Sequence, residues 1–125
     1  NMDAKDKISQ ADNLKFSEKL RTLFIGEDSG QHVNNFVWAY NVDTQSLDRV
    51  LSAPAGAEST GLHGVDDLNG WTYILSSFQH PGEYTKATVA DIKTAGSAVD
   101  KALDAAYKSK TSASVGYITG SVKLA

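Results

Sequence analysis

The sequence contains no cysteine. This absence excludes a disulfide framework, a thiolate metal site and a cysteine nucleophile within the chain. Long apolar runs are also missing, because the longest ones, residues 22–25 and 36–40, fall far short of the roughly 20 residues that span a bilayer. No basic leader followed by an apolar segment opens the chain, so the sequence shows no signal peptide. We therefore expect no membrane span.

Charge is sparse as well, since 22% of the 125 residues are charged and the formal net charge is −3. This mild acidity gives no electrostatic footprint for nucleic acid or for an anionic membrane. The hydrophobic fraction of 41% is too high for a disordered chain. The length fits one domain. We expect a single domain over residues 1–125 that has no nucleic-acid partner.

Apolar residues alternate with polar ones through the first half of the chain, in short segments separated by turn-forming residues. This pattern predicts an antiparallel meander over residues 12–54. The segment 36–42 is apolar on both faces, so it needs cover on both sides. Four aromatic residues alternate with the strand period and are predicted to be core: Trp38, Tyr40, Trp71 and Tyr73. The four predicted strands cover residues 12–17, 22–26, 36–42 and 47–51.

The beginning of this meander recurs further along the chain. Apolar residues of the first two strands and of the connection between them have counterparts 48 or 49 residues later: Leu14 and Leu62, Leu20 and Leu68, Phe24 and Tyr73, Ile25 and Ile74. A four-stranded unit that recurs every 40 to 50 residues or so is typical of β-propeller blades, with chance similarity as the alternative. The second unit, over residues 57–83, is incomplete. Its predicted strands cover residues 59–65 and 71–78, with a hairpin turn at 66–70.

A helical period follows the second unit. Apolar residues at helical spacing predict an amphipathic helix over residues 86–110. They are Val89, Ile92, Val99, Leu103 and Ala106. A final strand is predicted over residues 114–123. The predicted fold class is therefore mainly β, with about one and a half propeller blades followed by a C-terminal helix and a last strand.

One and a half blades do not close a ring, and repeat architectures need about three or more units. The missing cover would come from the remaining blades of a longer parent protein or from self-association. Because the predicted strands have open edges and two apolar faces, we expect a homo-oligomer.

Two acidic residues that could bind a cation, Glu27 and Asp28, follow the second predicted strand. Asp12, Asn13 and Glu58 lie at the starts of the two predicted units and would face the end of the sheet where a propeller's central channel opens. Carboxylate, amide and carbonyl oxygens are the ligands that calcium prefers. The alternative is that these side chains only cap strands and form turns. The acidic segment 66–70 is more typical of a solvated hairpin turn than of a calcium loop.

The segment 79–83 ends the last strand of the second unit. The neutral imidazole of His80, beside Gln79, could bind a metal or relay a proton, and a structural, hydrogen-bonded histidine is the alternative. His32 and His63 have no spacing that favours a metal. Neither a Gly-x-Ser-x-Gly elbow nor a phosphate-binding glycine loop occurs in the sequence.

Four segments together resemble the C-terminal part of PhoX-type alkaline phosphatases, over residues 12–83. They are Asp12-Asn13-Leu14, residues 23–28, Glu58-Ser59-Thr60-Gly61 and residues 79–83. The resemblance implies a six-bladed propeller, periplasmic or secreted, that hydrolyses phosphomonoesters with a calcium and iron cluster. The family's iron site includes a cysteine, which this chain lacks.

The resemblance carries a set of functional expectations. The chain would be the C-terminal fragment of a metal-dependent phosphatase, inactive in isolation, with a phosphate ester as the parent's substrate. It would contribute part of a calcium site, with iron only in the full-length parent. The candidate calcium ligands are Glu27, Asp28, Asp12, Asn13 and Glu58, with Gln79 and His80 as further rim residues. The alternatives are a non-catalytic propeller-type binding or scaffold module and a lactonase-like propeller enzyme.

Overall fold

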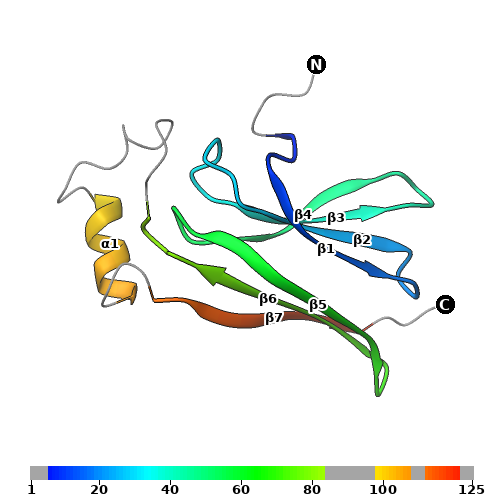
Figure 1. Cartoon of the computed structure of the whole chain (residues 1–125). Helices are drawn as coiled ribbons and strands as arrows, with labels where there is room; N and C mark the ends of the chain where they lie inside the picture. Colours follow the sequence, from blue (N-terminus) through cyan, green and yellow to red (C-terminus); the bar gives the residue numbers. More distant parts are fainter. Residues whose placement is uncertain (1–5, 84–97, 108–111, 122–125) are drawn as a thin grey trace.

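A computed structural model describes residues 6–83, 98–107 and 112–121 of the chain (Figure 1). Strands account for most of these residues, and one short helix interrupts their order. The elements are β1 (Ala11–Ser17), β2 (Thr22–Glu27), β3 (Phe36–Asn41), β4 (Leu47–Ser52), β5 (Glu58–Leu68), β6 (Trp71–Gln79), α1 (Ala98–Tyr107) and β7 (Ser114–Ser121).

The strands form two antiparallel sheets. The first sheet has the order β1-β2-β3-β4, so each strand pairs with the next one along the chain, as the predicted meander requires. The second sheet has the order β5-β6-β7. The two sheets lie one above the other, and β1 and β2 contact β5 (Figure 1).

These two sheets confirm a mainly β chain with little helix in the part that the structure describes. Propeller blades are not confirmed. The second sheet has three strands, and its hairpin of β5 and β6 is completed by β7, which follows α1 in the sequence.

The predicted hairpin turn at residues 66–70 is too long, because β5 continues to Leu68. Only Asn69 and Gly70 form the turn, and both have positive φ angles, 53° and 82°. Two successive residues of positive φ are what a tight hairpin needs to match the twist of its strands. The carboxylate of Asp67 accepts a hydrogen bond from the backbone N–H of Gly70 at 2.8 Å and stabilises the turn.

The C-terminal predictions fall partly outside the described residues. Within the helix predicted over residues 86–110, the structure describes α1 at Ala98–Tyr107. Within the strand predicted over residues 114–123, it describes β7 at Ser114–Ser121. No helix among residues 6–83, 98–107 and 112–121 is long and apolar enough to cross a bilayer.

The core lies between the two sheets. Phe24, Val37 and Ile74 are buried there, with Leu20, Ala39, Leu51 and Leu62 packed around them. We call the two sheet faces that carry these residues the inner faces and the opposite two the outer faces. The prediction that Trp71 is core is wrong, since 45% of its surface is exposed on an outer face, whereas Trp38 is 3% exposed.

Candidate functional site

Glu27, at the end of β2, is a fully buried carboxylate. Its Oε1 accepts a hydrogen bond from the backbone N–H of Ser9 at 2.9 Å, and its Oε2 accepts one from the backbone N–H of Phe36 at 3.0 Å. Nδ1 of His32 lies 3.0 Å from Oε2. One side chain therefore ties the N-terminal segment, the β2–β3 loop and the start of β3 together, and both of its oxygens are engaged by this chain.

Asn13 joins the two sheets. Its Nδ2 donates to the backbone carbonyl of Ser59 at 3.3 Å, and its Oδ1 accepts from the backbone N–H of Gly61 at 2.9 Å. The carboxylate of the neighbouring Asp12 accepts a further hydrogen bond from the same amide. The contact requires a bare backbone at Gly26 beside it, because a Cβ there would lie 2.8 Å from the Ser59 carbonyl oxygen.

Three of the predicted acidic residues come together near the start of β5. Glu58 is half-buried, and burial raises its pKa above the ordinary value. The charge of Asp28, a hydrogen bond with Asp28 and the charge of Asp12 raise the pKa further, while His80 lowers it. Nε2 of His80 lies 3.9 Å from Glu58 Oε1, and its Nδ1 lies 3.2 Å from Glu83 Oε2.

This convergence does not produce a metal centre among the described residues, where no three His, Asp or Glu side chains are arranged to hold an ion. Gln79 is engaged elsewhere, because its Nε2 donates to Thr60 Oγ1 at 3.0 Å. The sequence-predicted residues therefore divide between a buried hydrogen-bond network, an inter-sheet contact and an acidic cluster around Glu58.

Glu58 makes stability depend on pH. Because its pKa is raised in the folded state, the folded protein holds a proton that the unfolded chain has released, so stability falls as the pH rises through the interval between the two values. We expect Glu58→Gln to melt higher than the wild type at pH 7 and equally at pH 3.5. Glu83→Gln, at the exposed partner of His80, should give no such gain at pH 7. An equal gain from Glu58→Gln at both pH values in thermal melts would contradict this assignment.

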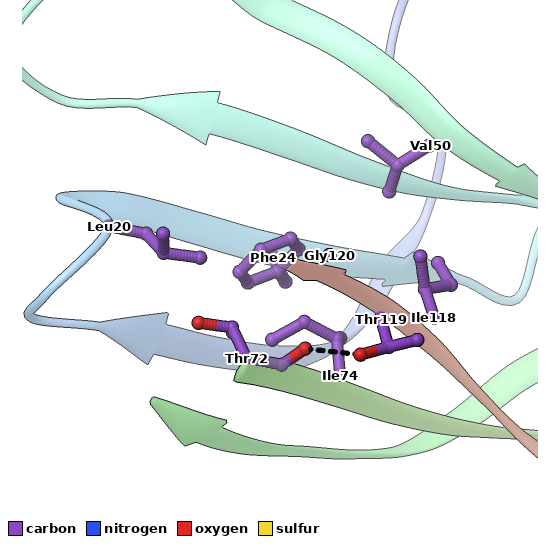
Figure 2. A pocket seen from close by; sticks show the side chains of 8 residues that line it. All are labelled: Leu20, Phe24, Val50, Thr72, Ile74, Ile118, Thr119 and Gly120. Atoms are coloured by element: carbon purple, nitrogen blue, oxygen red, sulfur yellow. Dashed lines mark hydrogen bonds between the residues drawn. The ribbon is translucent and has the colours of Figure 1, made fainter. Parts of the chain in front are cut away.

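The second candidate site is an apolar cleft between the inner faces, with a volume of about 210 Å³ (Figure 2). Both sheets contribute to its lining, which consists of Leu20, Phe24, Val50, Thr72, Ile74, Ile118, Thr119 and Gly120. The two threonine hydroxyls are satisfied within the chain. Thr72 donates to the Asp66 carbonyl at 2.8 Å, and Thr119 donates to the Thr72 carbonyl at 3.0 Å.

The cleft follows from the arrangement of the strands. Val50 of β4 and residues 118–120 of β7 line it, whereas β1 and β2 of the first sheet contact β5 of the second. Val37 pairs with Leu51 and Trp38 with Arg49, so Val50 is the extra residue of a bulge in β4. Gly120, on β7, leaves open space where a side chain would stand. A glycine inside a predicted strand, Gly120, is the one feature of the sequence that could have indicated the cleft. Its position beside the cleft depends on how the sheets pack, which the sequence pattern does not show.

No protein-family model matches the chain, and no solved structure matches it. A segment of 74 residues, 59% of the chain, is 34% identical to the histidine--tRNA ligase of Porphyromonas gingivalis (strain ATCC BAA-308 / W83). The chain spans 15% of the length of that ligase.

These comparisons contradict the resemblance to PhoX-type alkaline phosphatases, which no match supports. The phosphatase, calcium, periplasmic and propeller expectations that came with it are withdrawn. The physical reason lies in the residues that carried the resemblance. They are short strings at strand ends, such as Glu27-Asp28 and His80-Pro81-Gly82, and turn formation selects such residues in unrelated proteins.

Proposed function

We propose that this chain is a non-catalytic binding module that takes an apolar side chain of a partner protein into the cleft between its sheets. The observation that carries the proposal is the cleft itself, an apolar space that opens to solvent between two packed sheets (Figure 2). Concave apolar sites of this kind are where proteins bind ligands and anchor residues of partners.

The size and chemistry of the cleft favour a single apolar group. Apolar cavities of about 150 Å³ bind benzene, and sites for drug-sized ligands are usually about 300–1,000 Å³. A volume of about 210 Å³ therefore suits one aromatic ring or branched aliphatic side chain. Because the hydroxyls of Thr72 and Thr119 already donate to carbonyls of this chain, the lining favours a group without charge.

The strand at the mouth of the cleft favours an extended peptide as the carrier of that group. Among the described strands, β7 ends the order of the second sheet, and none of them pairs with its outer side, which we take to be open to strand pairing. Extended peptides bind such edges through main-chain hydrogen bonds and place alternate side chains into pockets beside them. A peptide on β7 would place one apolar side chain next to Gly120 and Ile118.

Indole, a mimic of the tryptophan side chain, tests the proposal. In a titration followed by methyl NMR, we expect saturable shifts at Val50, Ile74 and Ile118, with a dissociation constant on the order of 1 mM. An absence of saturable shifts up to about 10 mM indole, roughly tenfold above that constant, would overturn the proposal.

A matched pair of variants on β7 sharpens this test. Gly120 lines the cleft, whereas Gly116 does not, and a Cβ at either position meets no atom within 4 Å. Gly120→Phe should fill the cleft with its own ring and weaken indole binding at least tenfold. Gly116→Phe should leave the affinity unchanged. Equal affinity in both variants would place the indole site elsewhere.

A further inference from the structure

Both outer faces carry exposed apolar side chains. On the first sheet, Leu14 is 62% exposed and Phe16 is 39% exposed. Their cross-strand partners are Ile25 and Leu23, and these positions alternate with Phe24, which points into the core. Ile25 is only 8% exposed and its partner on β3, Trp38, is 3% exposed, so the exposed apolar surface of the first outer face lies on β1, at Leu14 and Phe16.

The second outer face is apolar and aromatic. Val115 is 79% exposed, Tyr117 is 66% exposed and Trp71 is 45% exposed. The rings of Tyr73 and Tyr117 pack edge to face, with their centroids 5.6 Å apart. Tyr73 precedes Ile74 on β6, and since Ile74 points into the core, Tyr73 points away from it.

The repeat in the sequence relates these faces to each other. Leu14 and Ile25, on the first outer face, have Leu62 and Ile74 as their counterparts, and both counterparts lie on the inner face of the second sheet. In the sequence repeat, the first outer face therefore corresponds to the inner face of the second sheet. That inner face packs against the first sheet within the chain.

The same relation holds in the other direction. Phe24, on the inner face of the first sheet, has Tyr73 on the second outer face as its counterpart. Inside the chain, the face with Phe24 packs against the face with Ile74. The equivalent contact would join the face with Tyr73 to the face with Ile25. These two faces lie on opposite sides of the chain, so they can meet only between two molecules.

We propose that copies of this chain associate head to tail, with the second outer face of one copy packed on the first outer face of the next. The contact is heterologous, so it generates either a closed ring or an open stack that leaves one outer face free at each end. The cleft between the inner faces takes no part in this contact, and the proposal is independent of the binding function proposed above.

Sedimentation of the full chain and of two face variants tests the proposal. The wild type should show a mass that rises with concentration up to about 1 mM. Leu14→Lys places a charge on the first outer face, and Tyr117→Lys places one on the second. Because both residues are exposed, each variant should fold and sediment as a monomer at every concentration. Ala102→Lys, on an exposed position of α1, is the control and should associate like the wild type.

A mixture of the two variants separates head-to-tail association from symmetric pairing. Tyr117→Lys keeps an intact first outer face and Leu14→Lys keeps an intact second one, so the mixture should form a one-to-one dimer that does not grow further. Three results would overturn the proposal: a monomeric wild type at about 1 mM, a variant that still self-associates, or a mixture that stays monomeric. Melting curves show that each variant is folded.

Discussion

Glu27→Ala is expected to lower the melting temperature by about 10 °C or more, because the substitution removes the acceptor of a buried network. The carboxylate is fully buried and accepts from the backbone N–H groups of Ser9 and Phe36, with His32 as its third partner. Each buried group left unsatisfied costs about 1–3 kcal/mol, and in a domain of this size 1 kcal/mol shifts the melting temperature by about 3–5 °C. Thermal melts followed by circular dichroism measure the loss.

Glu27→Gln is the matched variant, because it keeps the shape of the side chain and one carbonyl oxygen as an acceptor. It should lose less stability than Glu27→Ala, since the amide can satisfy only part of the network. Asp48→Ala, at an exposed position of β4, should melt within about 2 °C of the wild type, as surface substitutions usually change stability by less than 0.5 kcal/mol. A melting temperature of Glu27→Ala equal to that of Asp48→Ala would show that the network does not stabilise the fold.

Phe24→Ala should also destabilise the fold strongly, by about 3–5 kcal/mol of unfolding free energy. Phe24 is 7% exposed and belongs to the cluster with Val37 and Ile74 that joins the two sheets. Truncation removes the ring and leaves a void between the inner faces. Urea unfolding measures the change, with Phe24→Leu as the control that keeps most of the volume and should lose about 1 kcal/mol. Equal midpoints for Phe24→Ala and the wild type would mean that the sheets do not pack through this residue.

The first sheet could be predicted from the sequence because its strands are short, alternate clearly and are separated by turn-forming residues. All four strands begin and end within one residue of the predicted bounds. The end of β5 could not be predicted in this way, since Asp66 and Asp67 have the composition of a turn. In the folded chain, both carboxylates accept hydrogen bonds from Lys19 in the β1–β2 turn, so a contact between sheets extends the strand.

The roles of the polar residues depended on tertiary contacts that no local pattern contains. The sequence places Glu27 at the end of a strand, where a carboxylate is often exposed. Ser9 is 18 residues away from Glu27 in the sequence and His32 is 5 residues away. Folding brings both within hydrogen-bonding distance of the Glu27 carboxylate oxygens. The alternation of aromatic residues with the strand period identified which residues share a face, but it did not show which face is covered. The prediction for Trp71 failed for that reason, because Trp71 lies on an exposed face.

The most direct test of the proposed binding function is a set of intermolecular NOEs from bound indole to the methyl groups of the chain. Binding in the cleft predicts NOEs to Ile74 and Ile118 on the second sheet and to Val50 on the first, all from the same ring (Figure 2). These contacts should disappear in Gly120→Phe. NOEs confined to outer-face residues such as Leu14 or Val115 would contradict binding in the cleft.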